Sequence, residues 1–496
     1  MLRENKIFKD DMNSNKKSVQ KKISLNDYGE FISVYRGSGT LSIIDGSGEK
    51  PHQCSFEAGQ RIDGKIILLC HDLPQGFPLF FHFGMLATKF EGTTEEGFFV
   101  KSNEADKGLI RIRYLPPSKS GLHDQNLALK VTELSIVYSE EKYHELHFGI
   151  SNFEFDENDT LDNGKENKVI ISLTEEEKIE IFFKKLNDYD NKINRISTLR
   201  AIDVTCEFIL KISNQNDLNK LIELIDDICL ILSVKNGTKI SWVYYDICDK
   251  NGKQIVRKHG SKVTKVYQPL DIFNCCEKNS VPTKKFLEDS YQHYMKYRDL
   301  LKLNRGVIDA YLDAKAESDY IETRGGKIAL AIEFLKNEYL GSKGENSEYI
   351  IPPQEFNKCI PSISASMADA LKLQGVTDQN KIELISVEKK IEGLNRRSFG
   401  SILKEIKNEF HVNLSSKEIT LFIKCRNSLV HRGNFYCKTC QPEERQICEP
   451  LLSYIAEYFF MINILDRIFL RILGHDDKMI KVDWINPSEK IREWLK

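Results

Sequence analysis

The segment SSKEITLFIKCRNSLVHRG, residues 415–433, contains a complete predicted helix with a start, an apolar face and an end. Ser415 and Glu418 have the spacing of a capping box, and Leu414 is placed for a hydrophobic staple in front of it. Gly433 is the residue type favoured just past a helix end. Apolar residues share one helix face at Leu421, Phe422, Cys425 and Leu429. We therefore predict a helix that is buried along one side and stops at Gly433.

Helix signals continue on both sides of this segment, from about residue 280 onward. Apolar residues recur every three or four positions, and Pro or Gly marks the breaks. The predicted helices are Phe286–Leu303 after Pro282, a helix from Ser318-Asp319 to Gly341, Pro361–Leu373 after the Pro352-Pro353 loop, Asp378–Leu394, Phe399–Phe410, and Glu449–Leu473, which Gly474 ends. The last is apolar nearly all round, which is typical of a helix buried in a bundle or at a subunit interface.

The first half of the chain is strand-like, from roughly residue 26 to 275. Asn236-Gly237 and Asn251-Gly252 give the strongest hairpin signals, and one helix, Asp217–Val234, interrupts the strands. Alternating or β-branched runs are Leu41–Ile44 before Asp45-Gly46, Lys65–Cys70, Leu109–Leu115, Leu127–Tyr138 and Lys168–Leu173. The predicted fold class is α+β, with a strand-rich N-terminal region, of one lobe or of two that meet near residues 150–200, followed by an all-α helical bundle.

A chain of 496 residues is too long for one ordinary core. We expect a flexible basic tail at residues 1–25, the strand-rich region at 26–278 and the helical domain at 279–496. With 41% hydrophobic residues, 29% charged residues and a net charge of −2, the chain is predicted to be globular, without the global basic field of a nucleic-acid-coating protein. Charges interrupt the most apolar stretch, Tyr454–Leu473, so we expect no membrane span, and the polar first segment favours the cytoplasm.

The predicted helix at 415–433 carries Arg426, Asn427 and His431 near its end. Arginine is a permanent planar cation suited to holding a phosphate, and histidine exchanges a proton near neutral pH. Asn427 and His431 are four residues apart and share a helix face. Together these side chains are a minimal set for cutting RNA without a metal ion. The structural alternative is an ion-paired Arg426, with His431 and Arg432 as ordinary cations favoured by the helix dipole.

The surroundings of this motif resemble the HEPN superfamily, whose ribonucleases carry Arg, a polar residue, a short spacer and His on one helix. The chain as a whole is similar to anti-phage proteins of the ApeA type. Besides Arg426–His431, the segments that carry the resemblance are Tyr320–Thr323 leading to Ala331–Leu335, Arg397–Phe399 leading to Ile402–Leu403, Arg467–Gly474, and in the first half Gly39–Leu41 and Phe56–Gln60.

The resemblance implies an endoribonuclease that needs no cofactor for catalysis. The RNA 2′-hydroxyl would attack its own phosphodiester and leave a 2′,3′-cyclic phosphate and a 5′-hydroxyl end. His431 would be the general acid or base, Arg426 would hold the phosphate, and Asn427 would orient His431 or contact a phosphate oxygen. Glu333 would be either a supporting polar residue or an ion-paired side chain. Family sites form between two motif helices, so a homodimer or higher homo-oligomer is implied.

The same resemblance implies a role in abortive-infection defence. The strand-rich region would then be a sensing or regulatory part, and a phage protein is a candidate trigger. RNA with exposed single-stranded loops, such as tRNA anticodon loops, would be the substrate, because only unpaired nucleotides can swing in line for attack. The alternative is a non-catalytic HEPN-like module that only dimerises and binds a partner in a defence or regulatory complex.

Three cysteines follow the motif helix, at Cys437, Cys440 and Cys448. A C-x₂-C pair can hold one zinc ion from a tight turn, and the third thiol makes a structural zinc site a second hypothesis. The alternative is three unligated thiols, because the tetrad is incomplete. Candidates for a fourth ligand are Cys359, Cys425 and His475.

Overall fold

The computed structural model describes residues 24–45, 48–73, 87–102, 105–114, 125–155, 167–173, 178–199, 203–212, 218–260, 281–302, 307–316, 320–376, 388–439 and 453–476. The chain forms two compact units. The first consists of Met1–Arg61 and Lys65–Leu134, and the second of Ile62–Gly64 and Ser135–Lys496. The predicted boundary at 278/279 lies outside the described residues, between a strand that ends at Gly260 and a helix that begins at Thr283. The described residues on both sides of it belong to the second unit.

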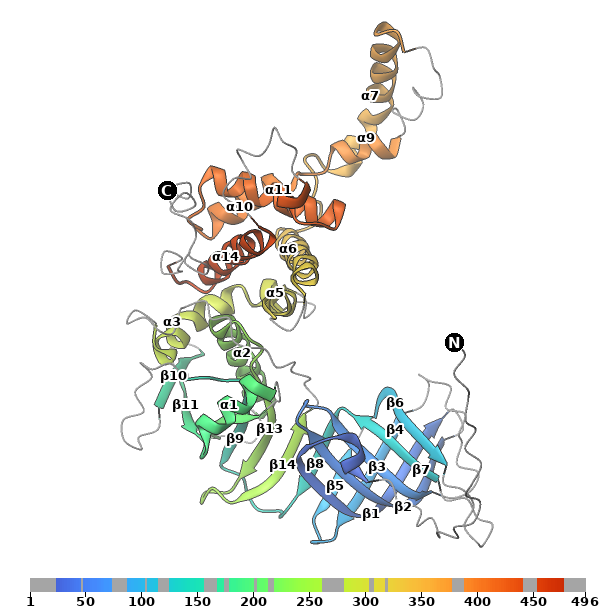
Figure 1. Cartoon of the computed structure of the whole chain (residues 1–496), viewed down its shortest axis with the longest axis vertical. Helices are drawn as coiled ribbons and strands as arrows, with labels where there is room; N and C mark the ends of the chain where they lie inside the picture. Colours follow the sequence, from blue (N-terminus) through green and yellow to red (C-terminus); the bar gives the residue numbers. More distant parts are fainter. Residues whose placement is uncertain are drawn as a thin grey trace, which may run out of the picture. The chain divides into compact units, whose positions relative to one another are not determined.

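The first unit is an antiparallel sheet with the strand order β5-β4-β1-β2-β3-β7-β6 (Figure 1). Its strands are β1 (Phe31–Asp45), β2 (Gly48–Arg61), β3 (Ile66–Leu73), β4 (Ala87–Thr94), β5 (Phe99–Ser102), β6 (Ala105–Tyr114) and β7 (Gln125–Val131). Alternate residues such as Leu41, Phe56 and Phe90 are buried on one face, as the two-residue period of a strand requires. A short 3₁₀ helix, η1 (Leu25–Tyr28), packs Leu25 against the other face.

The second unit begins with a sheet of strand order β10-β11-β12-β9-β13-β14-β8. Its strands are β8 (Glu133–Val137), β9 (Glu145–Ser151), β10 (Asn167–Ser172), β11 (Lys178–Lys185), β12 (Val204–Lys211), β13 (Ser241–Cys248) and β14 (Gln254–Gly260). Two helices, α1 (Tyr189–Leu199) and α2 (Leu218–Asn236), pack on it. The predicted hairpin at Asn251-Gly252 joins β13 to β14, with Gly252 at φ +76°. Asn236-Gly237 is no hairpin turn, because Asn236 ends α2 and Gly237 adopts the left-handed φ of +62° directly after it.

The helical part of the second unit follows β14. Its helices are α3 (Thr283–Lys296), α4 (Arg298–Lys302), α5 (Val307–Lys315), α6 (Ile321–Ser342), α7 (Pro353–Leu373), α9 (Glu388–Leu394), α10 (Phe399–Glu409), α11 (Ser416–Arg432), α12 (Tyr436–Thr439) and α14 (Tyr454–Ile472). The α7 helix starts earlier than predicted, at Pro353, because proline suits the first turn, and Pro361 lies inside it. The predicted α+β class is confirmed.

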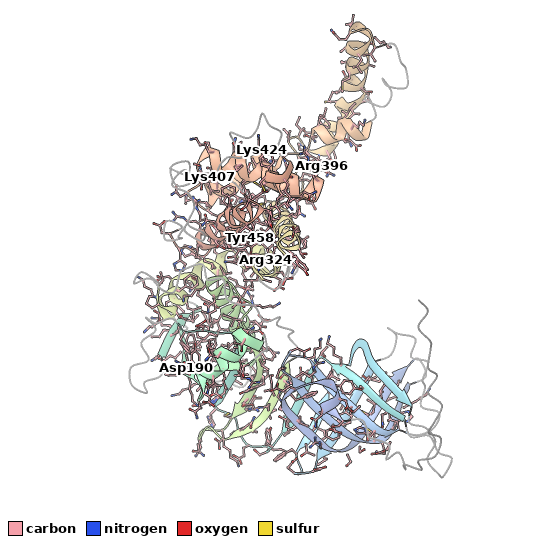
Figure 2. All side chains as sticks on the ribbon, viewed as in Figure 1. Asp190, Arg324, Arg396, Lys407, Lys424 and Tyr458 are labelled. Atoms are coloured by element: carbon pink, nitrogen blue, oxygen red, sulfur yellow. The ribbon has the colours of Figure 1, made fainter. Side chains whose placement is uncertain are left out.

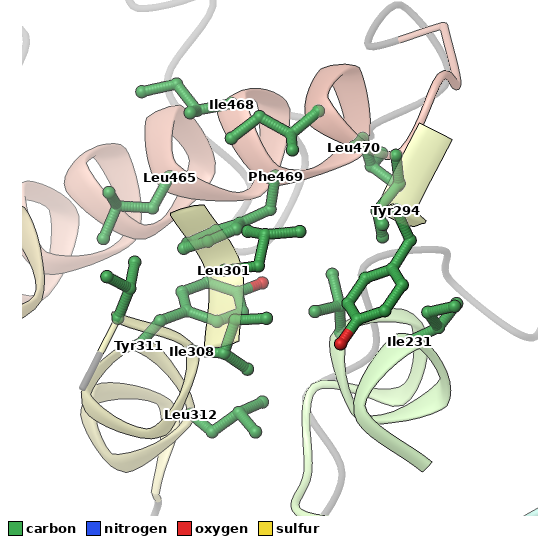
Figure 3. Packing of buried hydrophobic residues seen from close by; sticks show 14 of the residues in the cluster. Ile231, Tyr294, Leu301, Ile308, Tyr311, Leu312, Leu465, Ile468, Phe469 and Leu470 are labelled. Carbon is green, nitrogen blue, oxygen red and sulfur yellow. The ribbon is translucent and has the colours of Figure 1, made fainter. Parts of the chain in front are cut away.

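One hydrophobic core runs from the sheet of the second unit through its helices. In Figure 3, Ile231 of α2 and Tyr294 of α3 pack near Leu470 of α14, while Tyr311 of α5 packs on Phe469, with their ring centroids 4.4 Å apart. Most of α14 is buried within the single chain, whereas Ile455 near its start is 39% exposed. Among the helices of the described residues, none is both long and apolar enough to cross a membrane.

Candidate functional site

The motif helix α11 is fixed at both ends as predicted. Ser415 and Glu418 form the capping box, with N···O distances of 2.7 and 3.1 Å. Gly433 adopts the left-handed conformation at φ +65°, and its N–H donates to the carbonyl of Leu429. The second carboxylate oxygen of Glu418 accepts a hydrogen bond of 2.6 Å from Arg467 of α14. Because both members of this ion pair are buried, the start of α11 is held against the centre of the bundle.

Arg426 is buried and points toward α6, which lies beside α11 (Figure 1). Its Nε donates to Oε1 of Glu333 at 2.8 Å, and its Nη2 donates to the same oxygen. Its Nη1 donates to Oδ1 of Asn427 at 2.8 Å. The guanidinium carbon also lies 4.9 Å from the ring centroid of Phe399 in α10, within cation–π range. Three elements therefore determine where this guanidinium lies.

Glu333 is the partner that sequence reasoning left open, and it is ion-paired. It also binds Lys336, one turn along α6, with an N···O distance of 2.5 Å. Burial alone would raise the pKa of Glu333, but the hydrogen bonds from Lys336 and Arg426 hold it below its usual value. Glu333 is therefore a carboxylate at neutral pH, and it offsets part of the positive charge of Arg426.

His431 and Asn427 are exposed on the outer side of α11. Within the described part of the chain, no hydrogen bond or ion pair of His431 is found, so its imidazole is accessible to solvent and ligands. The structure thus joins Arg426 to Asn427 directly and places His431 one turn further along, at the end of the same helix. No hydrogen bond between the described residues links His431 to either of them.

The segment after α11 is anchored by two residues that the sequence pattern did not single out. Glu457 of α14 is fully buried and accepts the backbone N–H groups of Tyr436 and Cys437 at 2.8 and 2.9 Å. Gly325 of α6 leaves room for the ring of Phe435, because a Cβ at this position would lie 2.8 Å from that ring. The turn that follows the motif is consequently fixed to α6 and α14.

The structure describes only part of the predicted zinc site. Cys437 is half-buried, whereas Cys440 and Cys448 lie outside the described residues. Within the described ranges, no group of three metal-ligating side chains is found.

The fourth-ligand candidates are in different settings. Cys425 is fully buried in the core, and Cys359 is exposed on α7. Nε2 of His475 lies 2.7 Å from the hydroxyl of Ser290, and the histidine ring stacks on Phe286.

Three functional groups with different chemistry lie near the C-terminal end of α11. Arg426 supplies a positioned cation, Asn427 supplies an amide, and His431 supplies an exposed group that can take up or release a proton. The ion pair of the buried Arg426 with the half-buried Glu333 agrees equally with the structural alternative. Comparisons of the chain with protein-family models, with curated proteins and with solved structures found no match.

Proposed function

We propose that the protein is a metal-independent endoribonuclease of the HEPN type that acts in the cytoplasm as an abortive-infection defence protein. One observation carries the proposal. The cation Arg426 is buried and positioned, while the proton-exchanging His431 is exposed at the end of the same helix. Phosphodiester cleavage without a metal requires this combination of a positioned cation and an accessible proton-exchanging group.

Arg426 is the proposed phosphate ligand. A guanidinium has five N–H donors. Glu333 takes two of them and Asn427 takes one. Among the described residues, the remaining two donors have no partner, and they would bind the non-bridging oxygens of the scissile phosphate. Glu333 is then a positioning residue, which holds the guanidinium in one orientation.

His431 is the proposed proton carrier. It would take the proton of the RNA 2′-hydroxyl as the oxygen attacks phosphorus. The P–O bond to the departing 5′-oxygen would break as the protonated His431 of the second chain in the proposed homodimer gives its proton to that oxygen. The products are a 2′,3′-cyclic phosphate and a 5′-hydroxyl end, and no metal takes part. Asn427 would orient the phosphate or the imidazole. Substrates with unpaired loops, tRNA anticodon loops above all, suit this geometry of attack.

The active form is proposed to be a homodimer or higher homo-oligomer, with two α11 ends facing each other. The exposed end of α11 favours this contact, because Val430, 39% exposed, lies next to His431 there. The buried α14 gives no support to a dimer. The strand-rich residues would sense the infection, with a phage protein as the candidate trigger.

The test is to map RNA ends in cells that express the parent chain or His431→Ala. Since His431 is exposed, its replacement should leave the fold intact. We expect 2′,3′-cyclic phosphate ends and growth arrest with the parent, and a loss of both by about 10²–10⁴-fold with the variant. Exposed Lys417→Ala, at the opposite end of α11, is the matched control. Identical RNA ends and toxicity with His431→Ala would reject the nuclease proposal.

The second candidate is a non-catalytic HEPN-like binding module. The Arg426–Glu333 ion pair favours it, because a paired and buried arginine can be explained by packing alone. On this alternative, His431→Ala retains full protective activity, whereas variants that break the ion pair lose protection in proportion to the loss of folded protein.

A structural zinc ion held by Cys437, Cys440 and Cys448 is proposed as an addition to either function. Its role would be to stabilise the segment that follows α12.

A further inference from the structure

A hollow of about 540 Å³ lies where α9 joins α10, at the base of the segment that contains α7 and α9. Figure 2 labels Arg396 at this junction. The hollow is lined by Tyr349, Ile350, Arg396, Arg397, Ser398 and Ser401. These side chains combine two guanidiniums, three hydroxyl groups, an aromatic ring and an aliphatic group. Guanidinium and aromatic groups are the types that contact the phosphates and bases of single-stranded nucleic acids.

Hydrogen bonds connect the two backbone segments that border the hollow. Tyr349 and Arg396 form an antiparallel β-bridge. Next to it, the buried side chain of Asn395 binds both the N–H and the carbonyl of Ile351, at 2.9 and 2.6 Å. Nη1 of Arg397 donates to the carbonyl of Ser347 at 3.1 Å. The backbone on both sides of the hollow is therefore held in place.

The two arginines differ in their availability. Arg397 forms an ion pair with Glu405, so most of its charge is already compensated. Arg396 is exposed, and among the described residues no carboxylate or other hydrogen-bond partner is found for its guanidinium. A free cation beside an aromatic ring and a 67% exposed Ile350 can bind a phosphate on one side and a base on the other.

The hollow also adjoins the motif. Phe399 follows the hollow residue Ser398 and lies under the guanidinium of Arg426. Gly400 lets the first turn of α10 approach α11, because a Cβ there would lie 2.9 Å from Ile423. Phe399, the chain neighbour of Ser398, therefore connects the hollow to the proposed phosphate ligand by direct packing.

We propose that this hollow binds one nucleotide of a single-stranded RNA, with its phosphate on Arg396 and its base against Tyr349. The proposal rests on the proposed function for the identity of the ligand, and it names a substrate-binding subsite outside the Arg–Asn–His motif. The same chemistry would accept a free nucleotide, so the test includes both sources.

The experiment measures binding without cleavage. The full-length His431→Ala protein is titrated onto a fluorescent 12-nucleotide single-stranded RNA, with and without Arg396→Ala. We expect Arg396→Ala to weaken binding by about tenfold and to reduce the slope of log affinity against log salt by about 0.7, one single-strand phosphate contact. Tyr349→Ala should weaken binding by about fivefold or more through lost stacking. Exposed Lys358→Ala on α7 is the charge-matched control and should change nothing.

The possible results separate the subsite proposal from the nuclease proposal. Equal binding by the Arg396→Ala, Lys358→Ala and unsubstituted proteins overturns the subsite. Adenosine monophosphate that binds in an Arg396-dependent way, with no RNA binding, also overturns it in favour of a free-nucleotide site. Arg396-dependent RNA binding supports the subsite, and if the parent with His431 then leaves that RNA intact, the nuclease proposal fails while the subsite stands.

Discussion

Glu333→Gln tests whether the ion pair with Arg426 sets the position of the proposed phosphate ligand. Glutamine keeps an oxygen that accepts a hydrogen bond from Arg426 but removes the negative charge. Two unit charges about 4 Å apart attract by about 4 kcal/mol at an effective dielectric constant of about 20. Desolvation offsets part of this, since the side chains of Arg426 and Glu333 are only 10% and 26% exposed. Exposed ion pairs contribute about 0.2–1 kcal/mol to stability, and breaking a buried pair costs about 3–5 kcal/mol. Because this pair is partly buried, we expect Glu333→Gln to lower the free energy of unfolding by a value between these ranges, about 2 kcal/mol.

The assay is thermal unfolding at neutral pH, where this loss should lower the unfolding midpoint by about 2–3 °C for a unit of this size. Glu338→Gln, on the same helix and without an ion pair among the described residues, is the matched control. The pKa of Glu333 is lowered in the folded chain, so its contribution is present at neutral pH and disappears as acid titrates the carboxylate. Parent and variant should therefore converge at low pH. Equal midpoints for Glu333→Gln and Glu338→Gln at neutral pH would refute the assigned role of the ion pair.

Three further predictions concern the surroundings of the site. Burial lowers the pKa of His475 to about 4, so between pH 6.5 and 5 this histidine binds a proton in the unfolded chain but not in the folded chain. The free energy of unfolding should therefore fall by about 2 kcal/mol over this range. His475→Gln should show a smaller fall in urea titrations. If zinc is bound, elemental analysis should find about one ion per chain in the parent and none in the Cys437→Ser, Cys440→Ser double variant; a metal-free parent would reject the zinc site. Gly433 has a φ of +65°, so Gly433→Ala should destabilise the chain by about 1 kcal/mol in the same titrations. Gly326 lies in an exposed part of α6 without a positive φ, so Gly326→Ala should stabilise the chain by about 0.5–1 kcal/mol. Equal effects of the two substitutions would contradict the role of Gly433 in ending α11.

The sequence by itself determined the local structure of the motif helix. Ser415 and Glu418 satisfy backbone groups of the same turn, and Gly433 relieves strain at a single residue, so neighbours along the chain carry all the information needed. The same is true of the hairpin at Asn251-Gly252. The Asn236-Gly237 prediction was wrong because a left-handed glycine serves equally to end a helix. The helix predicted over Asp217–Val234 extends to Asn236, so Gly237 ends that helix and does not form a hairpin turn.

The tertiary structure alone decided where the motif side chains point and what they contact. Arg426 pairs with Glu333, which is 93 residues away in the sequence, and Glu457 holds a turn 20 residues before it. The boundary between the two compact units near residue 134 is also a tertiary feature. The strands after it belong with the helices because both share one hydrophobic core. Helix periodicity and caps depend on residues a few positions apart, whereas such contacts depend on how whole elements pack to bury their apolar faces.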